Sequence, residues 1–266
     1  MVRSRGSLVW MLVLGACGSS GTGRPGATDA AGDGDGDGPA PTDGAANDAA
    51  RNPPGAPRLG AHVLAYHRLH AGVTPLTTPA IATAGSGSTI VVSIGRGALA
   101  ATAAPTDSRG NPYAQLGTAH PYTNWSSSGT SLYAATAISG GAGHTISATT
   151  PADDEITLAA VEVVDGAAVH DAQWNEVLAP APLRSRSVTT TGPATLVAFW
   201  WGDAGVEQDK TAVPDNGFVV VDSVLAAGAL VQCAVAVREV ADAGTYDVTW
   251  TATPTQGAQL WIVAVQ

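Results

Sequence analysis

From Arg58 onward, apolar and polar residues alternate with a period of two, in short runs separated by Gly, Pro, Asn and Asp. This pattern is typical of β-strands bounded by turns. No stretch after Arg58 keeps a helical period with capping residues for more than about two turns. The predicted strands cover residues 61–67, 81–83, 89–95, 113–116, 131–138, 144–148, 155–164, 172–177, 185–191, 194–201, 218–224, 229–239, 245–251 and 260–265.

These closely spaced short strands predict an all-β fold, an antiparallel β-sandwich of jelly-roll type over Arg58–Gln266. Tyr246, Val248 and Trp250 alternate with polar residues and are expected to face the core. Residues 194–201 are apolar at every position, so we expect this strand to lie centrally in a sheet, under a second layer.

The segment from Gly18 to Pro57 has a different composition. It consists mainly of Gly, Ala, Asp, Pro and Thr and has almost no large apolar side chain to bury. Such a composition predicts a disordered linker. The run Asp33–Gly38 resembles the start of a calcium loop, but Gly44 stands where that loop requires a carboxylate, so we interpret it as a solvated spacer.

The first residues carry a targeting signal. Two cations, Arg3 and Arg5, precede an apolar run over 8–14 that is too short to span a bilayer as a helix. Its end, Leu14-Gly15-Ala16-Cys17, resembles the lipobox of bacterial lipoproteins. The resemblance implies a signal peptide over 1–17, export, and a lipid on Cys17 that anchors the chain to the cell envelope. Gly18, the residue after this cysteine, resembles the residue found there in bacterial lipoproteins of the outer membrane. The alternative is an ordinary signal peptide with an incidental cysteine.

Charge and cysteine content narrow the classes of partner. The net charge is −10 and Lys210 is the one lysine, which argues against nucleic-acid binding because phosphate contacts need clustered cations. The chain has two cysteines. If Cys17 carries lipid, Cys233 has no partner for a disulfide, and its place in an alternating apolar run predicts a buried small side chain.

Several segments together resemble a family of exported bacterial β-sandwich modules of largely unassigned activity. They are Thr106–Tyr113, Ser131–Ala135, Gly141–Ile146, Val161–Gly166 and Asp171. The resemblance covers Ser88–Gln266 and implies the sandwich fold, because the shared motifs are turns and core positions. Modules of this family often accompany carbohydrate-active or adhesive regions. Val163-Val164 depart from the Tyr-Ser often found after the Glu of the family pattern.

The sequence assigns no catalytic residue and no cofactor. It has no His-Glu-x-x-His, Gly-x-Ser-x-Gly or phosphate-binding loop motif. Glu162 lies in an apolar strand, where we expect it to pair with Arg96 or Arg238 rather than act as a catalytic acid. Asp107 and Asn111 bracket a tight turn; they are weak candidates for a calcium site, and bonds to their own backbone are the favoured interpretation.

The aromatic residues give the better indication of function. The chain has seven Trp but two Phe, and Trp125 lies in a polar loop. Trp201 and Asp203 begin a second polar loop. Aromatic faces beside polar groups suit sugars, so we predict that Trp125, Trp201 and Asp203 form a glycan-binding surface at one end of the sandwich. The alternative is that Trp200 or Trp201 belongs to the core.

Together these features predict an exported, membrane-anchored lipoprotein that acts as a non-enzymatic binding or adhesion module. Its expected partners are the membrane, through its N-terminal lipid, and a glycan or a surface protein. The alternatives are a hydrolase or lyase acting on polysaccharide, and a purely structural envelope protein. Two carboxylates converging in one groove would favour the hydrolase. An aromatic strip without them would favour binding.

Overall fold

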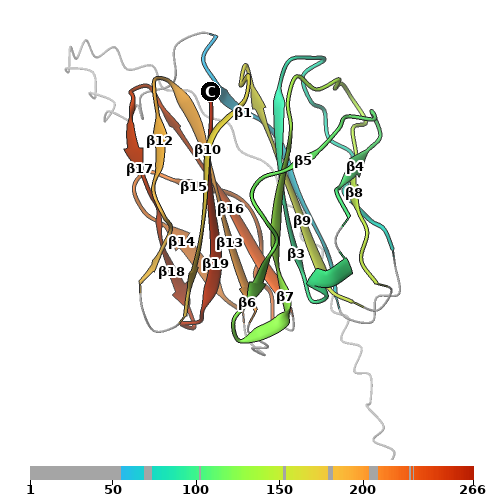
Figure 1. Ribbon diagram of the computed structural model, residues 1–266, viewed down its shortest axis with the longest axis vertical. Coiled ribbons are helices and arrows are strands. Elements are labelled where there is room, and N and C mark those ends of the chain that lie inside the picture. Colours follow the sequence, from blue (N-terminus) through green and yellow to red (C-terminus); the bar gives the residue numbers. More distant parts are fainter. Residues whose placement is uncertain are drawn as a thin grey trace, which may run out of the picture. The chain divides into compact units, whose positions relative to one another are not determined.

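We describe the protein from a computed structural model, which defines residues 55–68, 74–101, 103–151, 154–178, 182–203, 209–227, 229 and 231–266. Antiparallel strands dominate these ranges, and they contain one short 3-10 helix, Leu99–Ala101. The predicted all-β sandwich is confirmed (Figure 1). No helix in these ranges is long and apolar enough to cross a membrane. The predicted signal peptide, Cys17 and nearly all of the linker lie outside the described residues.

The first half of the fold is a large sheet and a small one. The large sheet has the strand order β1-β9-β3-β7-β5, and β6 pairs with β7. The small sheet has the order β2-β8-β4. The bounds are β1 Arg58–His67, β2 Leu76–Thr77, β3 Thr89–Arg96, β4 Thr106–Asp107, β5 Ala114–Gln115, β6 His120–Tyr122, β7 Trp125–Ala135, β8 Ile146–Ala148 and β9 Ile156–Val164.

The second half follows after a tight turn at Asp165, which adopts a left-handed backbone conformation (φ 61°). Its large sheet has the order β10-β19-β13-β16-β15, and its small sheets are β11-β18-β14 and β12-β17. The bounds are β10 Val169–Val177, β11 Leu183–Arg184, β12 Val188–Thr190, β13 Ala194–Asp203, β14 Thr211–Pro214, β15 Val219–Val224, β16 Val231–Val240, β17 Gly244–Tyr246, β18 Thr249–Thr253 and β19 Ala258–Val265.

The two halves repeat one topology. In each large sheet the first strand pairs with the last, and the remaining strands follow in the same order. The small sheets β2-β8-β4 and β11-β18-β14 correspond in the same way. Even the bulge in the first strand recurs, between Leu59 and His62 and between Val169 and Asp171. This strand order is that of a jelly roll. The predicted jelly roll is therefore present twice, within one compact unit.

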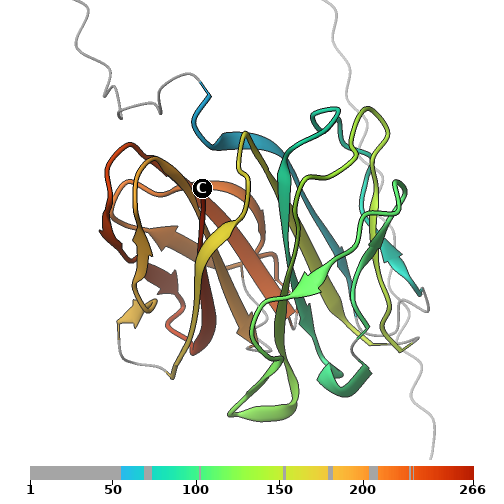
Figure 2. The ribbon, with the colours of Figure 1, turned by 45° about the horizontal axis from the view of Figure 1, so that its top comes forward.

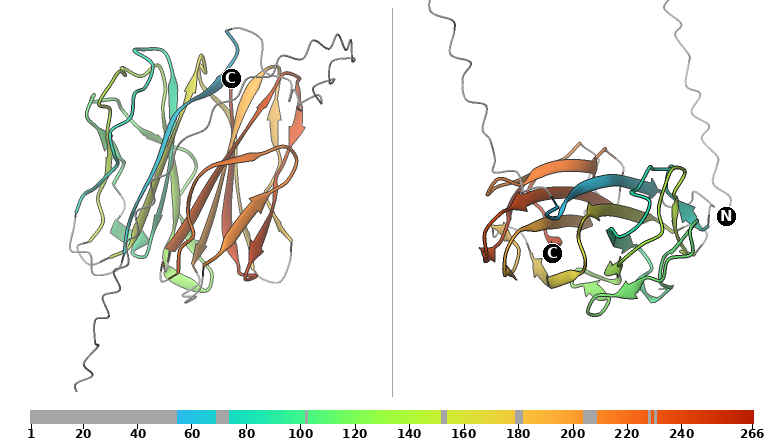
Figure 3. Two further views of the ribbon diagram at one scale, coloured as in Figure 1. Left: turned by 180° about the vertical axis from the view of Figure 1, so that it is seen from behind. Right: turned by 90° about the horizontal axis from the view of Figure 1, so that it is seen from above.

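Three layers of buried side chains hold the halves together. One core lies between the large and small sheets of the first half, and a second lies between those of the second half. The third core lies between the two large sheets, which face each other (Figures 1 and 3). Equivalent positions from both halves line it, such as Val161 and Val263. Both halves thus present the same face, as the subunits of a two-fold dimer do.

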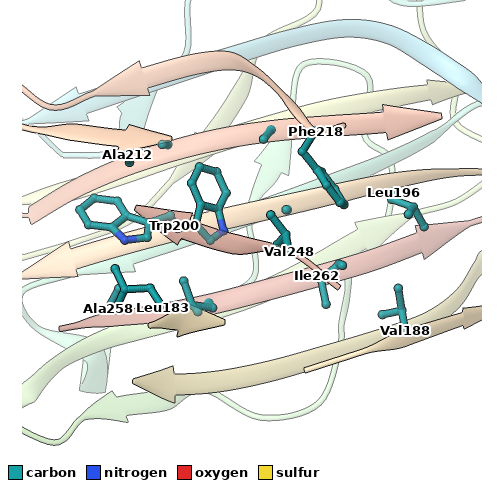
Figure 4. Close-up of a cluster of buried hydrophobic side chains, with 14 of the residues drawn as sticks. Leu183, Val188, Leu196, Trp200, Ala212, Phe218, Val248, Ala258 and Ile262 are labelled. Carbon is teal, nitrogen blue, oxygen red and sulfur yellow. The ribbon is translucent and has the colours of Figure 1, made fainter. Parts of the chain in front are cut away.

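The strand β13 shows why the sequence here is apolar on both faces. It lies between β16 and β19, with a core on each side of the sheet. Trp200 points into the core of the second half, shown in Figure 4 together with Val248 and Ile262. The prediction of a central, doubly covered strand is confirmed. The inward face formed by Tyr246, Val248 and Trp250 is confirmed as well, since all three contact this core.

The seam between the large sheets has two edges. At one edge β1 of the first half lies beside β15 of the second, visible from above in Figure 3. At the other edge, β10 of the second half faces the segment Leu116–His120, which follows β5. In a two-fold arrangement these two edges are equivalent, because β1 corresponds to β10 and β15 to β5. Only the second edge contains the cleft described next.

Candidate binding cleft

The cleft opens at the seam edge formed by β10 and the segment Leu116–His120, and we call it the seam cleft. Its volume is about 250 Å³. Ligand pockets commonly measure about 300–1,000 Å³, so the seam cleft suits a small unit such as a single ring. It is lined by Leu116, Gly117, His120, Ala172, Gln173, Trp174, Arg186 and Trp261.

Three aromatic rings line the seam cleft, and we call them the aromatic wall: His120 and Trp174 are half-buried, and Trp261 is buried, with 3% of its surface exposed. The rings of His120 and Trp174 are stacked, with centroids 3.8 Å apart and planes within 6° of parallel. Trp261 lies at a tilt to His120, with centroids 5.2 Å apart. Trp174 and Trp261 stand directly opposite each other on the paired strands β10 and β19. Residues opposite one another in an antiparallel pair share a sheet face, which explains why both rings reach the same cleft.

Buried hydrogen bonds hold this wall in place from behind. The indole Nε1–H of Trp261 donates to Thr130 Oγ1 over 2.9 Å, and the Thr130 hydroxyl donates to Gln259 Oε1 over 2.7 Å. Gln259 Nε2 in turn donates to the carbonyl of His120 over 3.1 Å. The chain from Trp261 to His120 therefore ties β19 to β6 across the seam. Such satisfied buried networks fix side-chain positions.

A second tie joins the β6–β7 hairpin to β10. The backbone N–H of Thr123 donates to Glu176 Oε2 over 3.0 Å, and the Thr123 hydroxyl bonds the other oxygen of the same carboxylate. Glu176 follows Trp174 on the same face of β10. The hairpin that carries His120 is thus fastened to the strand that carries Trp174. The cleft walls come from both halves but are bonded to each other.

The seam cleft has one cation and a neutral imidazole. Burial lowers the pKa of His120 below its usual value, and the nearby Glu176 carboxylate only partly opposes this. His120 is therefore uncharged near neutral pH, when its ring stacks as an apolar face. Arg186 is exposed at the rim. Gln173 lies on the wall, with its amide nitrogen donating to Asp171 Oδ1 over 2.8 Å.

Of the predicted aromatic site, Trp125 is exposed and Trp201 is not. Trp125 begins β7 in the hairpin that projects from the lower end of the molecule (Figure 2), and 59% of its surface is exposed. Trp201 is 1% exposed and packs edge-to-face on Tyr122, with centroids 5.8 Å apart. Gly95 on β3 leaves the room that its indole fills, since a Cβ there would lie 1.9 Å from the indole nitrogen.

The assignment of Trp201 to a binding surface is therefore corrected: both faces of β13 are covered, so Trp201 belongs to the interior of the seam. Tyr122 links the two tryptophans, because it contacts Trp201 and pairs with Trp125 across the hairpin. Asp203 ends β13, and its side chain lies outside the described residues. Of the three predicted residues, Trp125 alone presents a described, exposed side chain.

The turn at Asp107 and Asn111 serves the fold. The Asp107 carboxylate, whose side chain is fully buried, accepts hydrogen bonds from the backbone N–H of Arg109 and Asn111 and from the side chains of Asn111, Tyr113 and His144. Burial alone would raise its pKa, but these bonds outweigh burial and lower the pKa to about 2. Donors reach both oxygens, which agrees with the favoured interpretation of a turn held by its own side chains. No group of three or more metal-binding side chains occurs among the described residues.

Glu162 and Cys233 are structural as well. The Glu162 carboxylate accepts hydrogen bonds from the backbone N–H of Ala61 over 3.0 Å and of Ala84 over 2.8 Å, and it does not pair with Arg96 or Arg238 as the sequence suggested. It holds the bulge of β1. Cys233 is buried in the seam core, as predicted, and burial raises the pKa of its thiol to about 12.

One feature of the sequence indicates the cleft residue Trp174, which was not predicted as a site residue. In Ala172–Val177 a tryptophan stands in a strand whose other members are mostly polar or small. This composition is typical of an edge strand, and β10 is indeed an edge strand whose residues are mostly half-buried rather than buried. A tryptophan in such a half-buried strand indicates a ring that is in part available for contact.

The opposite edge of the seam is closed. His62 Nδ1 on β1 lies 2.7 Å from Asp222 Oδ2 on β15. The backbone N–H of Leu59 donates to Glu239 Oε1 over 2.9 Å, which adds a second bond across the same edge. We call the His62–Asp222 pair the latch.

Comparisons of the chain with protein-family models, with curated proteins and with solved structures found no significant match.

Proposed function

We propose that this chain is a lipid-anchored protein of the bacterial cell envelope that binds glycan in the seam cleft without transforming it. The observation that carries the proposal is the aromatic wall of His120, Trp174 and Trp261 in an open, ring-sized cleft. Sugar rings have apolar C–H faces that pack on aromatic rings, while their hydroxyls need polar partners at the rim. Gln173 and Arg186 supply such partners.

The composition of the cleft supports binding over hydrolysis. Glycoside hydrolysis generally uses a pair of carboxylates on either side of the scissile bond. The described residues that line the seam cleft include no Asp or Glu. The nearest carboxylates in sequence are engaged: Asp171 accepts from Gln173 and Thr189, and Glu176 accepts from Thr123. A polysaccharide hydrolase therefore has less support than a binding module.

Trp125 extends the proposed surface beyond the cleft. The hairpin from His120 to Trp125 is fastened to β10 at Glu176, and for this reason we include the exposed ring of Trp125 in the proposed binding surface. A glycan of more than one residue would contact both rings. We expect Trp125→Ala to weaken binding of longer glycans and to leave binding of single sugars unchanged.

The test is a glycan-array screen of the full-length chain, purified in a detergent without a sugar headgroup. We expect Trp174→Ala to lower affinity about tenfold, because a stacked ring contributes about 1 kcal/mol beyond its buried area. Trp174→Phe keeps a ring and should retain most of the affinity. Val219→Ala is the control, since Val219 is an exposed apolar residue that lies on β15 at the latch edge, away from the cleft. No retained glycan, or equal losses in Trp174→Ala and Val219→Ala, would overturn glycan binding in this cleft.

The anchor is tested separately. The Leu14–Cys17 match supports lipidation of Cys17, and several acyl chains hold a protein on a membrane stably where one does not. In bacteria fed a palmitate analogue, we expect Cys17→Ser to abolish labelling and membrane association. Cys233→Ser is the control, because Cys233 is buried and should not affect labelling. Equal labelling of wild type and Cys17→Ser would contradict the proposed anchor.

A further inference from the structure

Arg186 is distinguished from the other arginines of the described chain by having no partner there. Each of the others forms an ion pair, a hydrogen bond to a carbonyl, or a cation–π contact. These are Arg58 with Asp165, Arg68 with Ala227, Arg96 with Thr149 and Ala103, Arg109 with Ala142, Arg184 with Asp247, and Arg238 over the ring of Tyr246. In a chain with a net charge of −10, carboxylates outnumber cations, so a cation left without one is unusual.

The acidic groups on β10 are already hydrogen-bonded to other residues, which explains why the Arg186 guanidinium has no carboxylate partner within the described part of the chain. Asp171 on β10 accepts a hydrogen bond from the Gln173 amide at one oxygen and from the backbone and hydroxyl of Thr189 at the other. Glu176 is bonded to Thr123 and Gln259. His120 is neutral near pH 7 because burial lowers its pKa. The positive charge of Arg186 is therefore the one charge that faces the seam cleft from its described lining residues.

We propose that the seam cleft selects a carboxylated sugar, a hexuronate residue, with Arg186 binding the carboxylate. This inference rests on the proposed glycan binding and deepens it. The guanidinium presents a planar set of donors that matches a carboxylate with two parallel hydrogen bonds. A hexuronate carries its carboxylate at the sixth carbon, outside the sugar ring, and Arg186 lines the same cleft as Trp174. The acidic protein as a whole repels anions, so selection comes from this local contact.

The test uses matched pairs of sugars that differ only in the group at the sixth carbon: glucose and glucuronate, galactose and galacturonate, mannose and mannuronate. Binding to the full-length chain is measured by titration calorimetry in the same detergent. At least one uronate should bind about tenfold or more tightly than its neutral partner, because charge-assisted bonds are about twice as strong as neutral ones. Added salt should reduce the preference.

Variants assign the preference to one side chain. Arg186→Gln should remove the preference for uronate without changing the thermal midpoint, and Arg186→Lys should keep only part of it because an ammonium lacks the planar fork. Arg184→Gln is the matched control: Arg184 is also exposed, lies two residues earlier and is paired with Asp247. It should leave the preference intact.

The outcomes separate the two proposals. Equal binding of both members of every pair, or a preference that survives Arg186→Gln, would overturn uronate selection and leave glycan binding standing. Competition by acetate as strong as that by uronate would also overturn it, because the ring would then not be recognised. No binding of any of the six sugars or of the arrayed glycans would overturn the proposed function itself.

Discussion

The two edges of the seam occupy equivalent places in a repeated topology, yet one is closed and the other forms a cleft. Strand pairing identifies the corresponding residues. Leu64 pairs with Ala159 at the closed edge, and Trp174 pairs with Trp261 at the open edge. Each pair stands at the same register of its half. Two large rings at the open edge thus replace a leucine and an alanine at the closed one.

The latch positions differ in the same way. His62 corresponds to Ala172 through their partners Val161 and Val263. Asp222 pairs with Val235, and the equivalent residue by backbone hydrogen bonding is Leu116. Ala172 and Leu116 both line the seam cleft and cannot form an ion pair. The edge without the latch is the edge with the aromatic wall. The candidate site therefore lies where the two halves differ in sequence, whereas the fold rests on the positions that they share.

The largest expected effect is in the interior of the seam, between the two edges. Trp201→Ala removes a buried ring from against Tyr122 and should lower the free energy of unfolding by about 3–5 kcal/mol. Trp125→Ala, the exposed control, should change it by less than about 0.5 kcal/mol. Urea denaturation followed by circular dichroism measures both. Similar losses in the two variants would show that Trp201 is not a core residue.

Exchanging the edge residues should have a smaller, asymmetric effect. Leu64→Trp adds a ring at the closed edge and should destabilise the protein by about 1–3 kcal/mol through overpacking, without creating a second binding site. Trp174→Leu converts the open edge toward the closed composition and should lower glycan affinity by no more than the roughly tenfold expected for Trp174→Ala, while the protein stays folded. A stable Leu64→Trp protein that binds two sugars per chain would contradict the account of the closed edge.

Removing the latch should cost less again. The His62 and Asp222 side chains are both partly exposed, and exposed ion pairs contribute about 0–1 kcal/mol. Asp222→Asn should therefore destabilise the protein by less than about 1 kcal/mol and leave glycan affinity unchanged. A double-mutant cycle with His62→Gln isolates the pair. A coupling energy well above 1 kcal/mol would mean that the latch, rather than packing, closes this edge.

The smallest expected effect is on pH dependence at the open edge. Burial lowers the pKa of His120 below the value of about 6.5 for an unfolded histidine. The unfolded chain then binds a proton more readily, so the contribution of His120 to stability is complete above pH 6.5 and falls as the pH drops through the folded pKa. Titration of the imidazole signal by NMR should give a midpoint below 6.5, lower still in Glu176→Gln. A midpoint above 6.5 would contradict the neutral stacked ring.

Much of the fold followed from the alternation of residues. Strands buried on both faces, such as 194–201 and 260–265, were long apolar runs that the sequence marks clearly. The short strands β2, β4, β6, β11 and β14 were not predicted, because two to four residues pair only when the rest of the fold brings them together. The predicted strand over 81–83 is wrong, since only an isolated bridge at Ile81 forms there. The repeated topology was hidden because equivalent positions differ in chemistry: Glu162 and Ala264 occupy the same register in their halves.

The candidate site was predicted less well. Pattern reasoning identified tryptophan as the informative residue type and found Trp125, but it assigned Trp201 to a surface because a polar loop follows it, whereas Trp201 is 1% exposed. The cleft itself depends on β10 meeting the segment Leu116–His120 of the other half, and no local pattern encodes that contact. The stacking of His120 on Trp174 joins residues from two halves of the chain.

The most direct test of the central claim, that the open edge is the binding site, is residue-resolved NMR of the indole N–H groups. The full-length chain labelled at tryptophan is titrated with each of the six neutral and acidic sugars. We expect the signals of Trp174 and Trp261 to shift, while those of Trp200 and Trp250, buried in the core of the second half, remain unchanged. Shifts confined to Trp125, or no shift with any sugar, would contradict the claim.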